Sequence, residues 1–271
     1  MNEYKERYKY KRSNGLIPSP YDKRDYKFKD IVPLGAFLIP DNYESKEFPY
    51  VYDQGQTQMC VACSYSAVRY LQESEWSQSG ITEPFSPTFH YGNRPDDEMF
   101  EGMYLRTCCK NGRQGSILLR ELNEFCTTKR AVSLVRSKSE EYFKKAEPYK
   151  ISSFYTCNSR REIQQAIIST KAVITGIPIY DSFFTPNSEG IIEFNPSKDI
   201  RSYGGHAITL TGWKTVNNIL YWRVLNSWGI EWGQNGYCWL PESYPWVEQV
   251  YAIVDTYIEN TFQEYMKQFY S

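Results

Sequence analysis

The sequence predicts an α+β fold with two lobes, a helical N-terminal lobe and an antiparallel β C-terminal lobe. Helix signals gather in the first half of the chain, and short strand signals separated by turns gather after Lys171. A run of helices followed by a run of strands is typical of this class. With 271 residues, 41% of them hydrophobic and 17% aromatic, the chain is long and apolar enough to bury a substantial core.

Three segments of the first half carry helix signals. Residues 62–73 contain no Gly or Pro and can gather their apolar side chains on one face, so we expect a helix there with Cys60 at its start. Residues 116–125 are a second candidate, because their three leucines are spaced for one helical face. Ser159 and Glu162 have the spacing of a capping box, which predicts the start of a third helix.

After Lys171 the chain changes to short runs of β-branched and aromatic residues, bounded by turns such as Asn217-Asn218. These runs predict five strands. They cover residues 172–179, 207–213, 219–225, 237–240 and 249–254.

Charge and hydropathy exclude several classes of protein. The chain has 31 basic and 32 acidic residues, a net charge of -1, which does not suggest a nucleic acid or an anionic membrane as partner. No stretch reaches the roughly 18 apolar residues of a membrane-spanning helix. The first twelve residues lack the apolar segment of a signal peptide. We therefore expect a cytoplasmic protein, and the sequence does not indicate its oligomeric state.

The seven cysteines indicate neither a disulfide framework nor a metal site, because their number is odd and no two Cys-x-x-Cys pairs occur. Cys60 and Cys63 form a single such pair, but a redox or zinc site would need a thioredoxin-like context or a second pair. No metal or organic cofactor is expected. The remaining cysteines are expected to be unreactive thiols, buried or half-buried: Cys108, Cys109, Cys126, Cys157 and Cys238.

Four residues occur in contexts that suit catalysis by a thiol. Cys60 lies six residues after Gln54, His206 follows two glycines, and Asn226 opens the run Asn-Ser-Trp-Gly. Thiolate chemistry needs a base, a group that orients the base, and a donor for the oxyanion, and these residues supply one of each. A helix start would also favour the thiolate of Cys60. The other histidine, His90, lies in no motif and is expected to be structural.

These motifs resemble those of the papain-like cysteine peptidases. In that family a Gln-Gly pair precedes the nucleophilic cysteine at the same spacing, and the asparagine opens a motif like residues 226–237, Asn-Ser-Trp-Gly-Ile-Glu-Trp-Gly-Gln-Asn-Gly-Tyr. The resemblance covers about residues 39–255. It implies the family's two-lobed fold, with a helical lobe at about 54–170, a β lobe at about 171–255, and the active site between them.

The resemblance also implies a role for each residue. His206 would take the proton of Cys60 and later protonate the leaving amine, while the side chain of Asn226 would orient the imidazole. Gln54 and the backbone N–H of Cys60 would form the oxyanion hole. Trp228 would shield the bond between His206 and Asn226 from water. Gly115 would correspond to the family's glycine stretch that pairs with the substrate backbone, although a turn before a helix explains it equally well.

The chain departs from the common family pattern in two places. Val61 stands where the family usually has a tryptophan, and Thr57 stands where it has a half-cystine, so that disulfide cannot form. The run Asp-Gln-Gly-Gln at residues 53–56 is similar to bacterial and phage members. Cys63 is a rival nucleophile, but no glutamine lies six residues before it, and the helix start suits Cys60 better.

The activity implied is that of a cysteine endopeptidase, which hydrolyses peptide or amide bonds of a peptide or protein substrate through a thioester at Cys60. Two alternatives stay open. One is an acyl or amide transferase on the same fold, and the other is a catalytically silent relative that binds peptides. The presence of all four residues argues against the silent relative, since a protein that only binds peptides does not need them.

The flanking segments are an N-terminal arm, residues 1–38, and a C-terminal tail, residues 256–271. The arm is rich in aromatic residues, and its prolines disfavour the helical pro-segment common in the family. Exposed tails seldom carry so many rings unless the rings pack on something. We expect residues 16–28 to form an extended strap that ties the lobes together and leaves Cys60 uncovered. The alternative is an autoinhibitory segment removed on activation.

Overall fold

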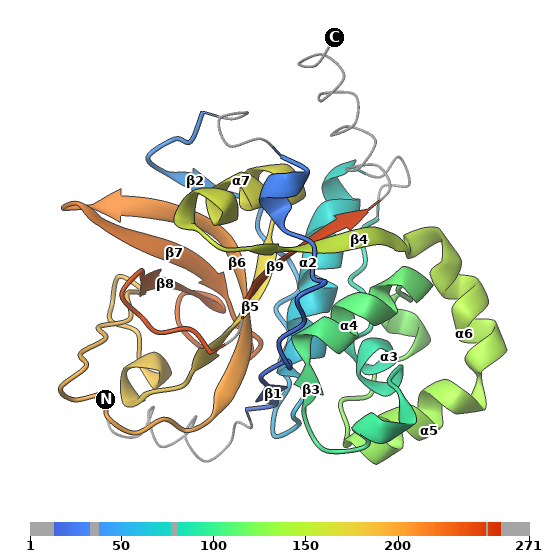
Figure 1. Ribbon diagram of the computed structural model, residues 1–271. Helices are drawn as coiled ribbons and strands as arrows, with labels where there is room; N and C mark the ends of the chain where they lie inside the picture. Colours follow the sequence, from blue (N-terminus) through green and yellow to red (C-terminus); the bar gives the residue numbers. More distant parts are fainter. Residues whose placement is uncertain (1–13, 33–37, 77–80, 248, 256–271) are drawn as a thin grey trace, which may run out of the picture.

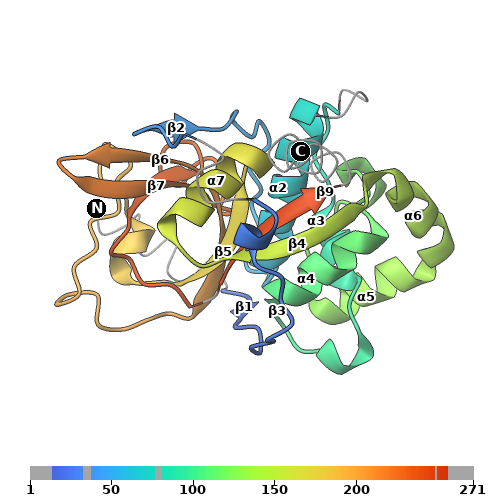
Figure 2. The same cartoon turned by 45° about the horizontal axis from the view of Figure 1, so that its top comes forward.

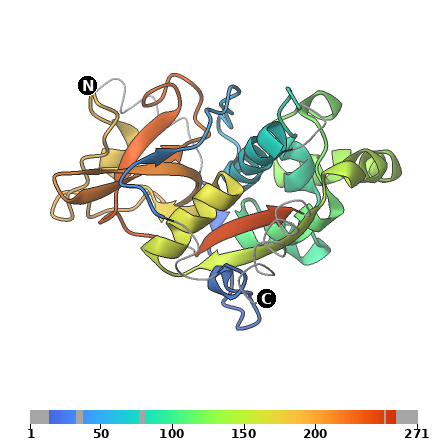
Figure 3. The same cartoon turned by 90° about the horizontal axis from the view of Figure 1, so that it is seen from above.

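The computed structural model describes residues 14–32, 38–76, 81–247 and 249–255. Two lobes lie side by side, with helices α3 to α6 in one and the strands β6, β7 and β8 in the other (Figures 1 and 2). The view from above separates the green helices of the first lobe from the orange strands of the second (Figure 3). The predicted α+β fold with two lobes is therefore confirmed.

Six α-helices carry labels in the described part of the chain. They are α2 (Cys60–Trp76), α3 (Pro87–Gly92), α4 (Leu105–Asn111), α5 (Thr128–Ser137), α6 (Ser139–Ala146) and α7 (Arg160–Thr170). Short 3-10 turns are η1 (Phe28–Asp30), η2 (Asp96–Glu98), η3 (Gly112–Gln114), η4 (Leu119–Glu121), η5 (Glu147–Tyr149) and η6 (Asp181–Phe184). Within the described ranges, none of these helices is both long and apolar enough to cross a membrane.

The strands form one sheet that reaches from one lobe to the other. They are β1 (Leu16–Ile17), β2 (Tyr43–Glu44), β3 (Met103–Tyr104), β4 (Ile151–Cys157), β5 (Val173–Pro178), β6 (Gly205–Val216), β7 (Ile219–Leu225), β8 (Tyr237–Pro241) and β9 (Val250–Asp255). The order along the sheet is β3-β1-β6-β5-β9-β4, and β2 and β7 also pair with β6 while β8 pairs with β7. Every pair is antiparallel except β1 with β3.

Local signals explain the elements that were predicted correctly. The five predicted strands are β5 to β9, each within a few residues of its expected ends. The capping box is present at α7, where the Ser159 hydroxyl accepts from the backbone N–H of Glu162 at 3.2 Å and the Glu162 carboxylate accepts from the backbone N–H of Asn158 at 3.0 Å. The expected helix with Cys60 at its start is α2.

The helix predicted at residues 116–125 is wrong, because only the 3-10 turn η4 forms there. Extended residues before that turn pair with another segment, through a bridge between Leu118 and Phe85. The Ser86 hydroxyl also bonds the carbonyl of Leu122, which is itself extended. Tertiary partners thus replace the helical hydrogen bonds. The sequence patterns also missed the strand β4, which pairs with β9.

Buried residues form one large cluster in each lobe. The cluster of the β lobe is dominated by tryptophans that are at most 1% exposed: Trp213, Trp222, Trp228 and Trp232. The second cluster surrounds α2, which packs against β6 and therefore lies at the junction of the lobes. This contact brings the first residue of α2 to the start of β6.

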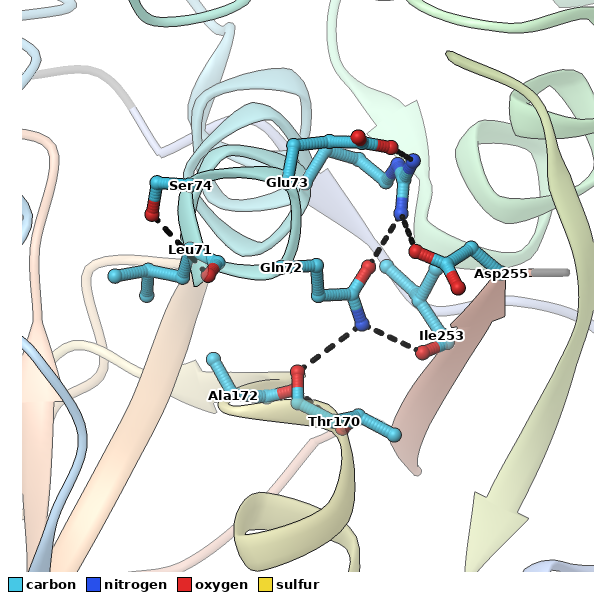
Figure 4. A network of polar contacts seen from close by, with 9 residues as sticks. Leu71, Gln72, Glu73, Ser74, Thr170, Ala172, Ile253 and Asp255 are labelled. Atoms are coloured by element: carbon cyan, nitrogen blue, oxygen red, sulfur yellow. Dashed lines mark hydrogen bonds and ion pairs between the residues drawn. The ribbon is translucent and has the colours of Figure 1, made fainter. Parts of the chain in front are cut away.

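A buried polar network anchors the other end of α2 to the sheet. The side chain of Gln72 donates to the carbonyls of Thr170 and Ile253, at 3.1 and 2.7 Å (Figure 4). The fully buried guanidinium of Arg69 forms ion pairs with Glu73 and, at 3.3 Å, with Asp255 of β9. This network fixes α2 against β9 over the second half of the helix.

Candidate active site

Cys60 is the first residue of α2 and is fully buried. The helix begins there because the carbonyl of Met59 accepts from the backbone N–H of Cys63 at 2.9 Å. Four backbone N–H groups interact with the Cys60 thiol, those of Ala207 in β6, Gly15 in the arm, and Cys60 and Val61 of the helix itself. The thiol thus lies between the start of α2, the first residues of β6 and the arm.

His206, the second residue of β6, is paired with Asn226, which follows β7. The imidazole Nε2 lies 2.7 Å from the Asn226 Oδ1, which also accepts from the backbone N–H of Ser227 at 2.8 Å. An amide oxygen only accepts, so the proton of the neutral ring lies on Nε2 and Nδ1 is the basic nitrogen. Nδ1 is buried without a hydrogen-bond partner among the described residues. It is therefore available to take a proton.

Aromatic side chains enclose the pair of His206 and Asn226. The ring centroids of His206 and Trp228 are 5.0 Å apart, and Trp228 is fully buried. Phe184 stacks on Trp228 at 5.6 Å, and Phe183 lies 6.2 Å from the imidazole. Exclusion of water strengthens a hydrogen bond in such a site. Phe183 and Phe184 were not among the predicted site residues, because no spacing in the sequence relates them to His206.

The side chain of Gln54 is held from both ends. Its carbonyl oxygen accepts from the Ser227 hydroxyl at 2.6 Å, and its amide donates to the carbonyl of Thr57 at 2.8 Å. The backbone N–H of Gln54 also donates to the carbonyl of Ser227 at 2.9 Å. These bonds connect the loop before Cys60 directly to the residue after Asn226. Ser227 is a site residue whose role the sequence pattern alone did not reveal.

The arm covers this site. Leu16 pairs with Gly205 of β6 and with Met103 of β3, so β1 bridges the two lobes (Figure 1). Gly15 lies so close to Gln58 that an added Cβ would stand 2.0 Å from the Gln58 carbonyl oxygen. The expected strap across both lobes is present, but the expectation that it leaves Cys60 uncovered is wrong. The arm is held at this position by backbone pairing with β3 and β6, which leaves no pattern of side chains in the sequence.

Burial sets the protonation of the site. Burial raises the pKa of the Cys60 thiol, and the N–H groups of Ala207 and Gly15 oppose that rise only partly. Burial lowers the pKa of His206 to about 4, against the opposite effect of its bond to Asn226. Both side chains are therefore neutral in this arrangement, and the thiolate expected at the helix start is not the favoured form while the arm is in place.

The remaining predicted residues lie away from this chemistry. Cys63 faces the interior, and burial raises the pKa of its thiol well above the usual value. His90 is fully buried between Tyr65 and Phe89, as expected for a structural histidine. Within the described residues no group of three or more His, Cys, Asp or Glu side chains could hold a metal.

Gly115 does not pair with the segment in the cleft. It packs on Ala146 at the end of α6, where an added Cβ would lie 2.0 Å from that residue's carbonyl oxygen. The glycine beside the arm is Gly102, with a φ of 93° and with the Gly15 carbonyl 2.7 Å from the position of its missing Cβ. The one feature that could have pointed to Gly102 is its position directly before the short strand β3.

Comparisons with known proteins agree with this geometry. The sequence model described as papain family cysteine protease matches residues 105–251, which is more than half of the chain. The match includes His206 and Asn226 and begins after Gln54 and Cys60. The bacterial or phage branch stays a prediction.

Two curated relatives from Caenorhabditis elegans match shorter segments. One is the cathepsin B-like cysteine proteinase 4, 37% identical over 76 residues, which are 28% of this chain and 22% of that protein. The other is a gut-specific cysteine proteinase, 30% identical over 95 residues, which are 35% of this chain and 28% of that protein. The chain thus matches less than a third of the length of either relative.

Solved structures share the fold along almost the whole chain. Xylellain, a cysteine protease from Xylella fastidiosa, has a TM-score of 0.73 at 22% identity, covering 90% of this chain and 96% of its own. The procathepsin B S9 of Trypanosoma congolense has a TM-score of 0.61 at 13% identity, covering 89% and 83%. The predicted two-lobed fold of this family is confirmed by these likenesses.

Proposed function

This chain belongs to the papain family of cysteine proteases, and we propose that it hydrolyses peptide bonds through a thioester at Cys60. The observation that carries the proposal is the 2.7 Å bond between His206 Nε2 and Asn226 Oδ1, made beside Ala207, whose N–H reaches the Cys60 sulfur. This bond leaves Nδ1 of His206 as the nitrogen that can remove the thiol proton.

The proposed reaction has two halves. With the arm displaced, His206 takes the proton of Cys60, and the thiolate attacks the carbonyl carbon of the scissile peptide bond. The imidazolium then protonates the leaving amine, and the acyl group remains on the sulfur as a thioester. In the second half His206 removes a proton from water, which attacks the thioester. The carboxylic acid leaves, and the thiol is restored.

We assign the oxyanion hole to the side chain of Gln54 and the backbone N–H of Cys60. A preorganised donor is effective because it does not need to reorient when charge develops on the carbonyl oxygen. The bonds from Ser227 and to Thr57 hold the Gln54 amide in one orientation. Asn226 orients the imidazole, and Trp228 keeps water from that bond.

We further propose that the chain is an endopeptidase. The segment that now lies at Cys60 is internal to a chain, since Gly15 is flanked by Asn14 and Leu16. Before Gly15 in the chain, Asn14 donates to the carbonyl of Tyr203 at 2.9 Å, and after it Leu16 pairs with Gly205. A cleft that accepts a continuous strand in this way suits internal peptide bonds.

The test is turnover of a peptide library by the full chain, with and without added amines, for the wild type, Cys60→Ala and Cys63→Ala. Hydrolysis that is lost in Cys60→Ala and kept in Cys63→Ala is the expected result. Cys63 is a matched control because it is a buried thiol one turn along the same helix. Products formed only when amines are added would instead indicate transfer. Hydrolysis by the wild type, or by the chain lacking residues 1–17, that persists unchanged in the matching Cys60→Ala variant would refute the proposal.

A further inference from the structure

A single strand, β1, separates β3 from β6 in the sheet. In the described part of the chain β3 joins the sheet only through β1, and β1 in turn pairs with β6. Leu16 faces Met103 on one side and Gly205 on the other. The backbone N–H of Met103 donates to the carbonyl of Gly15 at 2.8 Å. When β1 leaves, the edge of β3 therefore faces an empty slot that fits a single extended peptide.

Two buried side chains hold the residue that begins this edge. The hydroxyl of Tyr91 accepts from the backbone N–H of Gly102 at 3.0 Å. Nη1 of Arg94 donates to the carbonyl of Gly102 at 2.8 Å. Both backbone polar groups of Gly102 are thus bound by side chains of the helical lobe, one of them from α3. The position and direction of the next N–H, that of Met103, follow from this.

Arg94 also binds neighbouring residues that precede this edge in the chain. Its side chain is almost fully buried, lies 4.3 Å over the Tyr91 ring, and donates to the carbonyls of Tyr91, Glu98 and Phe100 at 2.7, 3.0 and 3.1 Å. Burying a charge among carbonyls is costly, and burial lowers the pKa of Arg94. As a result, the loop of residues 98–102 is held at three of its carbonyls.

Tyr91 is itself held in one orientation. Its hydroxyl donates to the Glu101 carboxylate at 3.2 Å and accepts from the Thr128 hydroxyl at 2.9 Å. The other carboxylate oxygen of Glu101 accepts from the backbone N–H of Thr128 at 3.0 Å, at the start of α5. The edge strand is thereby connected to α3 and α5, two rigid elements of the helical lobe.

We propose that Tyr91 and Arg94 are positioning residues that preform residues 102–104 as the docking edge for one extended peptide, at present the chain's own arm. This inference rests on the proposed function, because the peptide that replaces the arm would be the substrate. Pairing through backbone hydrogen bonds does not depend on the side chains of the peptide, so the edge would accept peptides of varied sequence. The absence of a Cβ at Gly102 allows the close approach of the peptide.

The test compares Tyr91→Phe with Tyr65→Phe in the full chain. Both tyrosines are fully buried in the helical lobe, but the Tyr65 hydroxyl has no hydrogen-bond partner among the described residues. Hydrogen exchange at the amides of Gly102 and Met103 reports on the edge. The rate at which iodoacetamide alkylates Cys60 reports on departure of the arm. Neither measurement needs turnover, so a failure of the proposed function would not decide the outcome.

In Tyr91→Phe we expect both rates to rise by roughly fivefold or more, since a buried N–H loses its acceptor, while Tyr65→Phe stays near the wild type. Thr128→Val, which removes one support of Tyr91, should act in the same direction and serves if Tyr91→Phe does not fold. Unchanged exchange at Gly102 and Met103 in Tyr91→Phe would overturn the proposal. So would equal increases in the two tyrosine variants, because they would show only a general loosening of the lobe.

Discussion

Gly15 lies directly on Gln58, two residues before Cys60, with no room for a side chain between them. Only glycine, whose side chain is a single hydrogen atom, fits at this position of the arm. With the arm in this position, Cys60 and His206 are completely buried. The following predictions start from that contact.

Gly15→Ala should displace the arm, because its Cβ would stand 2.0 Å from the Gln58 carbonyl oxygen and 2.4 Å from the carbonyl carbon. Overpacking of this kind typically costs about 1–3 kcal/mol, and near Gly15 the pairing of β1 and the bond from Asn14 to Tyr203 oppose displacement. We expect alkylation of Cys60 by iodoacetamide to accelerate roughly fivefold or more, in keeping with that range. Mass spectrometry of the adduct measures it, and a rate equal to the wild type would show that the arm does not control access.

Removal of residues 1–17 should lower the pH at which Cys60 becomes reactive. Burial raises the pKa of this thiol and lowers that of His206 to about 4. Water admitted by the truncation reverses both shifts, which favours the thiolate and imidazolium pair. The pH profile of Cys60 alkylation should move to lower pH and peptidase turnover should rise.

The control for this truncation removes only residues 1–13 and keeps Gly15 in place. Its profile should match that of the full chain. The truncation must also stop short of Phe28, because that ring is fully buried in the core of the β lobe. A fall in turnover for the chain lacking residues 1–17, with its fold intact, would show that the arm supports the active state.

Asn226→Ala should reduce kcat and leave measurable turnover, whereas His206→Ala should remove nearly all of it. The reason is that Asn226 selects the tautomer and orientation of the imidazole, while His206 transfers the proton itself. Trp228→Ala should act in the same direction as Asn226→Ala, because it admits water to the same bond. Steady-state kinetics on one peptide substrate provide the comparison. Equal and complete losses for Asn226→Ala and His206→Ala would contradict the assigned roles.

Acid should destabilise the folded chain through its two histidines. Burial, with a smaller effect of Arg69, lowers the pKa of His90 to about 3, against about 6.5 in an unfolded chain. Between these values the unfolded state binds the proton and the folded state does not, so stability falls as the pH decreases, by up to about 1.4 kcal/mol per pH unit for each histidine. His90→Phe should flatten this slope in urea denaturation measured from pH 7 to pH 4. An unchanged slope would mean that His90 is not buried as a neutral ring.

Arg69→Ala should destabilise the protein by about 3–5 kcal/mol, because it leaves the carboxylates of Glu73 and Asp255 buried without their cation. Urea denaturation measures the free energy of unfolding. Arg120→Ala is the control, since its ion pair with Glu83 is largely exposed and should contribute little. Similar small effects of the two substitutions would show that α2 does not depend on this network.

Local patterns in the sequence were sufficient for much of the fold. The helix α2 and the capping box of α7 follow from side-chain periodicity and from backbone groups satisfied within a few residues, and the strands β5 to β9 follow from runs of β-branched and aromatic residues. The same is true of the individual site residues, since each of Cys60, His206 and Asn226 stands in a short motif of its own. Residues 116–125 show the limit, because long-range pairing to Phe85 and Ser86 overrides their helical spacing.

Only the tertiary structure decided how these parts meet. The pairing of Gln54 with Ser227 and the choice of Gly102 over Gly115 beside the cleft depend on contacts between segments far apart in the chain. The position of the arm depends on main-chain hydrogen bonds, which any residue can make and which leave no periodicity to detect. The protonation of Cys60 and His206 depends in turn on that position, because burial is a property of the assembled molecule and not of a motif.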